Sequence, residues 1–126
     1  MNGQNLSDGE WKLMNLLWEE NPRTIGELVS ALWEDTGWTK ATVNIMLGRL
    51  AEKGAVAVDD TGRAKRFSPL LDRDEAVRQE ARNTLSRIRT GSLGLLLSTM
   101  ARECDLTKEE KEELYAILRE GGEGRD

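Results

Sequence analysis

Residues 39 to 54, TKATVNIMLGRLAEKG, contain the start, the buried stripe and the end of one helix. Thr39 is a good N-cap, because its hydroxyl can accept a hydrogen bond from a free amide of the first turn. Gly54 fits the left-handed position at which many helices end. Between them an apolar stripe recurs at helical spacing, at Val43, Leu47 and Leu50. The stretch therefore predicts a helix whose opposite face carries few charges.

Two capping boxes predict two further helices before this one. Ser7 with Glu10 opens the first, which we expect over about residues 8–20, where Asn21-Pro22 stops it. Thr24 with Glu27 opens the second, which we expect to end near Gly37. The apolar residues that follow each cap recur at helical spacing: Trp11, Met14, Leu17 and Trp18, then Ile25, Leu28, Val29 and Leu32.

The pattern after Gly54 changes from a helical period to short strands. Residues 55–58 are small and β-branched, residues 59–62 have turn chemistry, and residues 63–67 alternate before Pro69 breaks the strand. Three helices followed by a two-stranded hairpin are the order of a winged helix, in which the second and third helices form a helix-turn-helix. The sequence therefore predicts a mainly α protein with a winged helix in residues 1–70.

The sequence of residues 71–126 predicts C-terminal helices, and the segment is too small to bury their apolar side chains in a core of its own. One helix is expected from the Asp72 cap to about Thr90, an apolar one over Leu93–Met100, and a last one after the Thr107 cap, with a frayed tail. So small a segment commonly completes its core by forming an oligomer, so we expect a homodimer. The alternative is a monomer in which these helices pack onto the winged helix. The predicted dimerisation residues are Leu93, Leu96, Leu97, Met100, Leu114, Ile117 and Leu118.

The composition argues against an enzyme and against a metal protein. The 126 residues include no histidine and one cysteine, Cys104, so the chain has no Ser/His/Asp arrangement, no zinc finger and no internal disulfide. We expect no cofactor, and Cys104 is expected to be a small buried or neutral side chain. No segment has the length or pattern of a membrane span or a signal peptide, so we expect a cytoplasmic protein.

The charge is uneven along the chain, which bears on the partner. The net charge is −5, but residues 39–66 hold six basic and three acidic side chains. A locally basic surface suits phosphates, small residues allow close approach, Asn44 suits adenine and Ile45 suits a thymine methyl group. The predicted partner is double-stranded DNA, and the candidate contacts are Thr39, Lys40, Ala41, Thr42, Asn44, Ile45, Arg49, Lys53, Arg63, Lys65 and Arg66. The alternative is a protein-interaction module that uses the Ile45 face.

The order and spacing of many short motifs resemble the BlaI/MecI penicillinase-repressor family of bacterial transcriptional regulators. The similarity covers about residues 6 to 120. Its motifs are Leu6-Ser7, Glu10-Trp11, Met14 and Leu17-Trp18; Trp38-Thr39, Thr42-Val43, Leu47, Arg49-Leu50 and Lys53-Gly54; Phe67-Ser68-Pro69-Leu70; and Gly91-Ser92-Leu93, Leu106-Thr107, Glu113-Leu114 and Ile117-Leu118.

This resemblance implies a homodimeric repressor that binds a palindromic operator, with the third helix in the major groove. It also implies a sensor or protease partner that cuts the C-terminal region of some members between asparagine and phenylalanine. Here the matching bond is Ser98-Thr99, so this mode of release does not carry over directly. Ala41 and Asn44 replace basic residues of one member, so that member's operator does not carry over either.

Overall fold

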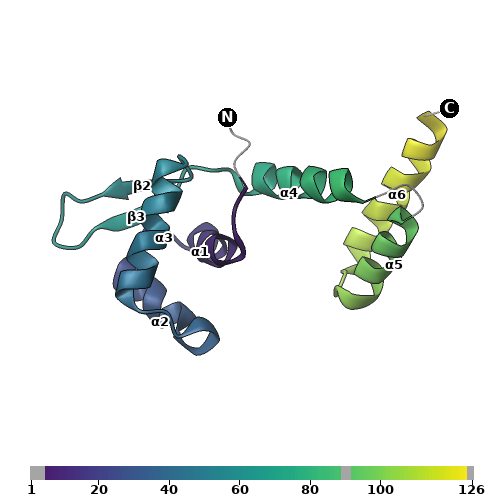
Figure 1. Cartoon of the computed structure of the whole chain (residues 1–126). Coiled ribbons are helices and arrows are strands. Elements are labelled where there is room, and N and C mark those ends of the chain that lie inside the picture. The colour runs from purple at the N-terminus through teal and green to yellow at the C-terminus, as the bar shows by residue number, and fades with distance from the viewer. Residues whose placement is uncertain (1–4, 89–91, 125–126) are drawn as a thin grey trace. The chain divides into compact units, whose positions relative to one another are not determined.

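The computed structural model describes residues 5–88 and 92–124 of the chain. This part is mainly helical with one small antiparallel sheet, as the sequence predicts (Figure 1). The chain divides into two compact units, Met1–Asn83 and Thr84–Asp126. The elements are α1 (Asp8–Glu19), β1 (Arg23–Thr24), α2 (Ile25–Thr36), α3 (Lys40–Glu52), β2 (Val56–Asp59), β3 (Arg66–Pro69), α4 (Arg73–Arg87), α5 (Leu93–Glu103) and α6 (Lys108–Gly124).

The caps predicted for the first three helices are confirmed. The Ser7 and Thr24 hydroxyls each accept the amide of the glutamate three residues later, at 3.2 Å, and both glutamates accept the cap amide in return, at 2.9 Å. Gly37 ends α2 with φ +66° and Gly54 follows α3 with φ +80°. Both angles are left-handed and favour glycine.

The core lies where α1, α2 and α3 meet the sheet. The stripe predicted for α3 is confirmed, because none of its three side chains is exposed. In α1 and α2 the predicted Met14, Leu17, Leu28 and Leu32 are buried, while both predicted tryptophans of α1 are half-buried. The buried cluster consists of Leu13, Met14, Leu17, Leu28, Leu32, Val43, Leu47, Leu50, Ala55, Val56 and Phe67.

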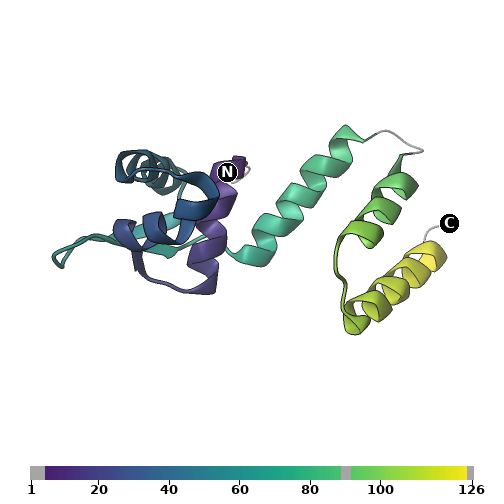
Figure 2. The ribbon, with the colours of Figure 1, turned by 90° about the horizontal axis from the view of Figure 1, so that it is seen from below.

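The hairpin forms the wing, but its strands lie further along the chain than predicted. β2 and β3 pair antiparallel with Val56 opposite Pro69 and Asp59 opposite Arg66, so residues 60–65 form a longer turn. A third strand, β1, was not predicted and pairs with the other edge of β3. β1 begins at Arg23, opposite Phe67, and runs away from Pro69, so Pro69 has a strand on the β2 side only and tolerates its missing amide. The hairpin tip projects beyond the helices (Figure 2).

The first part of α4 is attached to the winged helix. Trp18 Nε1 donates to the carbonyl oxygen of Leu71 at 3.0 Å, and Ala76 is buried. Trp18 also makes an edge-on contact with Trp11, with ring centroids 5.9 Å apart. The predicted Asp72 cap accepts the Glu75 amide at 3.0 Å. The predicted end of this helix near Thr90 and the break at Gly91 lie outside the described residues.

The C-terminal unit contains α5 and α6. Thr107 and Glu110 form the capping box predicted for the last helix, at 2.9 and 3.0 Å. The frayed tail is a wrong prediction for residues 121–124, because α6 continues as helix through Gly124; residues 125–126 lie outside the description. Cys104 is exposed at the end of α5, not buried. Every helix in the described part of the chain is too short or too polar to span a lipid bilayer.

Candidate nucleic-acid interface

α3 presents a small, weakly charged surface on the side opposite its buried stripe. The side chains of Ala41, Thr42, Asn44, Ile45 and Arg49 are all exposed, and Ile45 is 58% exposed. No atom lies within 4 Å of the place where a Cβ would stand on Gly48. Backbone and small side chains therefore define this face, which lets another molecule approach the helix closely.

Thr39 has a structural role at the start of α3. Its hydroxyl accepts the Thr42 amide at 3.3 Å and donates to the Thr42 hydroxyl at the same distance. Both groups are exposed. The cap fixes the orientation of the Thr42 side chain, and Thr42 stands one turn into the helix beside the outward face.

The wing carries exposed cations on a turn held by one carboxylate. Asp59 Oδ1 accepts the Thr61 amide at 3.0 Å and the Thr61 hydroxyl at 2.7 Å. These bonds, led by the one from the amide, together with the positive charge of Arg66, keep the pKa of Asp59 below its usual value. Asp59 therefore stays ionised and shapes the turn from which the exposed side chains of Arg63, Lys65 and Arg66 project.

Three elements surround an open hollow that we call the wing hollow. It is lined by Lys40, Ala41 and Asn44 of α3, by Ala64 and Lys65 of the wing, and by Thr24, Ile25 and Gly26 at the start of α2. The sequence indicated that α3 and the wing are both basic. The structure shows that the N-terminal half of α3 and the wing line the same hollow. Two of the lining side chains are lysines, so this hollow combines positive charge with the amide of Asn44.

The residues at the start of α2 were not among the predicted contacts. Ile25 and Gly26 begin the first turn of α2, where backbone amides have no partner within the helix and favour anions, whereas the amide of the N-cap Thr24 is already bonded to Glu27. The capping box was visible in the sequence, so this signal was available. What the sequence did not show is that this helix start lies beside α3 and the wing.

Arg49 and Lys53 lie at the other end of α3. Together with Glu52 they line a separate hollow formed with residues 5–7 and Glu10. Of the predicted contacts, Lys40, Ala41, Asn44 and Lys65 line the wing hollow, whereas Arg49 and Lys53 line the hollow near the start of α1. The Arg49 side chain is exposed and can contact DNA. The Lys53 side chain is half-buried and is less available for such a contact.

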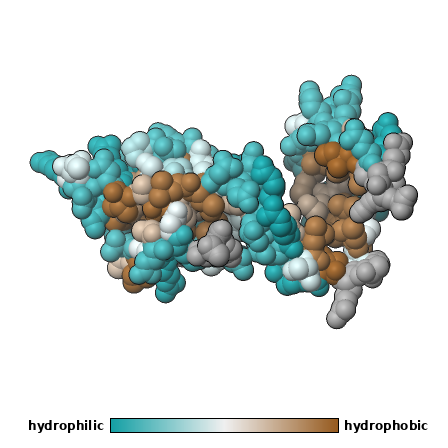
Figure 3. Space-filling model, turned by 90° about the horizontal axis from the view of Figure 1, so that it is seen from above, coloured by the Kyte–Doolittle hydropathy of each residue, from teal (hydrophilic) through white to brown (hydrophobic). Residues whose placement is uncertain are grey.

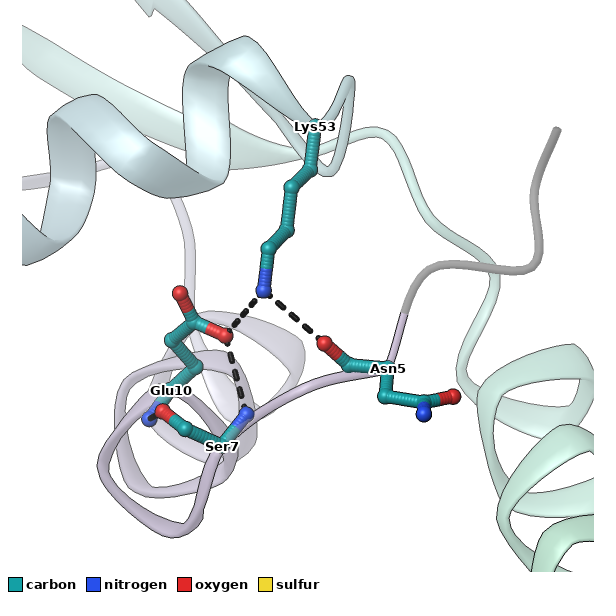
Figure 4. Close-up of polar contacts among 4 residues, drawn as sticks. All are labelled: Asn5, Ser7, Glu10 and Lys53. Atoms are coloured by element: carbon teal, nitrogen blue, oxygen red, sulfur yellow. Dashed lines mark hydrogen bonds and ion pairs between the residues drawn. The ribbon is translucent and has the colours of Figure 1, made fainter.

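The Lys53 ammonium is used inside the protein. Nζ lies 2.5 Å from Glu10 Oε1 and 2.8 Å from the carbonyl oxygen of Asn5 (Figure 4). Glu10 is only 3% exposed. Burial opposes its ionisation, but the hydrogen bonds from Lys53 and Ser7 and the charge of Lys53 outweigh burial and lower the pKa of Glu10. The charge predicted for a phosphate contact at Lys53 is thus already balanced by Glu10.

The C-terminal unit exposes a broad apolar surface (Figure 3). We define its apolar face as the exposed large hydrophobic side chains of α5 and α6. Leu96 was predicted with these residues and is half-buried. Leu95 and Tyr115 were not predicted, although they are 69% and 65% exposed. The apolar face consists of Leu93, Leu95, Leu97, Met100, Leu114, Tyr115, Ile117 and Leu118.

The bond Ser98-Thr99 lies inside α5. The Ser98 hydroxyl donates to the carbonyl oxygen of Leu95 at 3.1 Å, one turn earlier. Within residues 5–88 and 92–124, no three cysteine or acidic side chains gather closely enough to hold a metal ion.

Comparison with known proteins gives a consistent match. The family model described as penicillinase repressor matches residues 6–120. The penicillinase repressor of Bacillus licheniformis is 29% identical over 115 residues, covering 91% of this chain and 90% of that protein. The solution structure of the DNA-binding domain of the repressor BlaI is 28% identical with a TM-score of 0.52, covering 60% of this chain and 90% of that domain. The monomeric form of Bacillus licheniformis BlaI in complex with the blaP half-operator matches with 28% identity and a TM-score of 0.50, over 57% and 88% of the two chains.

Proposed function

Because this chain belongs to the penicillinase repressor family, we propose that it is a homodimeric repressor that binds a palindromic DNA operator through α3 and the wing. The family is one of transcriptional repressors and not of enzymes. Binding to DNA would place its site of action in the cytoplasm of a bacterial cell.

The observation that carries this proposal is the composition of the wing hollow and the adjoining face of α3. An α-helix fits the major groove of B-DNA, provided that its outward side chains are small enough to let the backbone approach. The exposed face of α3 meets this condition at Ala41 and Gly48. The lysines at the wing hollow, Lys40 and Lys65, supply positive charge beside that face.

We assign base reading and phosphate binding to different residues. Asn44 can pair with adenine and Ile45 can contact a thymine methyl group, while Ala41 keeps the helix close to the base edges. Thr42 and Arg49 can reach phosphate or base edges. The phosphate contacts in this proposal are Lys40, Arg63, Lys65, Arg66 and the first-turn amides of α2; Lys53 is left out because its ammonium is bonded to Glu10 and Asn5.

The proposed dimer rests on the apolar face. Eight large apolar side chains of α5 and α6 are exposed, which is costly in water, and a second copy of the chain offers an identical surface to cover them. A two-fold symmetric dimer would present two copies of α3, which matches an operator made of two inverted half-sites. A sensor or protease partner that acts on the C-terminal region stays a prediction from the family resemblance, and the Ser98-Thr99 bond differs from the asparagine-phenylalanine bond that is cut in some members.

Selection of bound sequences from a pool of random duplexes tests the proposal directly. We expect enrichment of an inverted repeat, with bound DNA carrying two protomers in sedimentation. A pool that shows no enriched sequence would contradict sequence-specific binding and would favour the protein-interaction role for the Ile45 face. Enrichment of a single, non-repeated site would contradict the dimeric, palindromic part alone.

A further inference from the structure

Asn5 joins the end of α3 to α4 through two different groups. Its carbonyl oxygen accepts a hydrogen bond from Lys53 Nζ at 2.8 Å, and its side-chain Oδ1 accepts one from Asn83 Nδ2 at 2.7 Å. The Asn5 side chain points away from Lys53 (Figure 4), so the two bonds leave the residue in different directions. We call Asn5 with these two bonds the Asn5 bridge.

The α3 side of the bridge is firmly held. Lys53 is bonded at the same time to Glu10, whose carboxylate is buried and closes the capping box of α1. The position of the Asn5 carbonyl oxygen is therefore tied to both α1 and α3. This makes Asn5 a fixed point on the winged helix from which a second bond can hold another element.

The α4 side of the bridge is oriented by a neighbour. Gln79 Nε2 donates to Asn83 Oδ1 at 3.1 Å, one turn earlier in α4. With its oxygen engaged by Gln79, the Asn83 amide presents its Nδ2 group to Asn5. The contact is thus a specific arrangement of two amides.

The bridge is a second attachment of α4, separate from the first. Near the start of α4, Trp18 is bonded to the carbonyl oxygen of Leu71 and Ala76 is buried. Asn83 follows Ala76 at a distance of about 10 Å along the helix. A helix held at one point can pivot about it, whereas two points along the axis fix its direction.

Apolar packing alone does not fix this direction. Ala76 is the only buried side chain of α4 among the described residues. A hollow of about 90 Å³ remains between α4, α1 and the N-terminal segment, lined by Asn5, Leu6, Trp11, Leu71, Glu75, Ala76, Gln79, Glu80 and Asn83. Close packing would leave no such space, so the hydrogen bond of the Asn5 bridge adds a constraint on α4 that side-chain packing does not supply there.

We propose that Asn5 is a positioning residue that sets the direction in which α4 leaves the winged helix and so sets the preferred spacing of the two operator half-sites. This inference rests on the proposed function, because spacing has meaning only for a dimer that binds two half-sites. Asn83 is the last residue of the winged-helix unit, so the bridge acts where the chain passes toward the C-terminal unit. The bridge determines the geometry of the pair of reading helices, and the contacts of each helix with its own half-site do not depend on it.

The test uses the full chain and duplexes in which the half-site spacing is varied one base pair at a time. Asn5→Ala removes the acceptor for Asn83 and keeps the carbonyl oxygen that Lys53 uses. Asn5→Asp keeps an acceptor at Oδ1 and serves as the rescue. Asn15→Ala removes an exposed amide from α1 and is the matched control. Thermal melts establish that each variant is folded.

We expect Asn5→Ala to reduce the preference for the best spacing over its neighbours by a factor of roughly 2 to 10, the fold-change that corresponds to one net hydrogen bond. Its affinity for a duplex with a single half-site should equal that of the parent chain. Asn5→Asp and Asn15→Ala should keep the parental spacing profile. A parental profile in Asn5→Ala overturns the inference, and so does a loss of single half-site affinity that accounts for the whole effect. A parent chain that binds none of the duplexes contradicts the proposed function itself, which is a different result.

Discussion

Lys53 and Glu10 form an ion pair that connects the end of α3 to the first turn of α1. The two residues are 43 positions apart, and the pair is largely withdrawn from water, with side-chain exposures of 28% and 4%. Its Glu10 oxygen is also the acceptor of the α1 capping box. One carboxylate therefore both caps α1 and fixes the distal end of the helix proposed to read DNA.

Lys53→Ala should lower the free energy of unfolding by about 1–3 kcal/mol, because it leaves the buried Glu10 carboxylate without its cation. Lys40→Ala is the matched control: Lys40 is exposed at the wing hollow, so its loss should change stability by less than about 0.5 kcal/mol while weakening DNA binding. Urea unfolding and DNA titration separate the two effects. Equal stability of Lys53→Ala and the parent chain would contradict this role for Lys53.

Stability should fall in acid through Glu10. Its folded-state pKa lies below the ordinary value of 4.5, so the ionised carboxylate stabilises the fold fully above that pH, and this contribution is lost as the pH falls through the folded-state pKa. Glu10→Gln should therefore differ most from the parent near neutral pH and least in acid. Urea unfolding across pH 2 to 7 measures the difference in stability between Glu10→Gln and the parent chain. The same comparison made in a Lys53→Met background should give a much smaller difference. A difference that stayed constant with pH would show that the carboxylate charge is not involved.

Gly48→Ala should have opposite effects on folding and on DNA binding. A Cβ at this exposed position in α3 meets no atom within 4 Å, so alanine should stabilise the helix by about 0.5–1 kcal/mol. The same methyl group would stand between the helix and the groove, so operator affinity should fall several-fold. Ser30→Ala, on the exposed side of α2, is a control that should raise stability without affecting DNA. Unchanged affinity in Gly48→Ala would remove this face from the contact.

Asn44 and Lys65 line the same hollow, but replacing each with alanine should change DNA affinity in a different way. Asn44→Ala should weaken operator binding by roughly 1–3 kcal/mol and relax the preference at one position of each half-site. Lys65→Ala should weaken operator and random DNA alike and flatten the slope of log K against log salt by about 0.9. Titrations at several salt concentrations distinguish the two. The assignment of Asn44 to base reading would not survive an equal loss on both kinds of DNA.

Ile117→Asp should dissociate the proposed dimer, because it places a charge on the apolar face. A buried, unpaired carboxylate costs about 3 kcal/mol or more, so the dimer dissociation constant should rise by at least about 100-fold. Ala116→Asp puts the same side chain on the neighbouring, exposed position of α6, pointing to the other side of the helix, and should leave the dimer intact. Sedimentation at several concentrations measures both. An intact dimer in Ile117→Asp would show that this side of α6 does not form the interface.

Local signals predicted most of the winged helix. Capping boxes, left-handed glycines and helical spacing depend on residues within one or two turns of each other, so Ser7, Thr24, Gly37 and the α3 stripe were all readable from the sequence. β1 was not predicted because a strand of two residues is too short to show the alternation of side chains that identifies a strand. The shift of the hairpin strands has a related cause, since pairing is set by partners across the sheet and the turn residues did not fix the register.

The site was less predictable than the fold because its geometry is made by contacts between distant residues. Exposure of Asn44, Ile45 and Arg49 followed from the helical period, and the structure agrees with it. The bond of Lys53 to Glu10 has no local pattern, so a lysine at the end of a basic segment was counted as a DNA contact. The approach of Thr24 to α3 and the wing likewise arises only in the folded unit.

The edge-on pair of Trp11 and Trp18 gives this protein an intrinsic optical reporter. Trp18 is bonded to the carbonyl oxygen that precedes α4, and Trp11 lines the hollow beneath that helix, so detachment of α4 changes the polarity around both indoles. The other two tryptophans, Trp33, which is 56% exposed, and Trp38, which packs against the core, take no part in these α4 contacts and contribute a nearly constant background. Emission spectra can therefore follow the docking of α4 in solution without any attached dye.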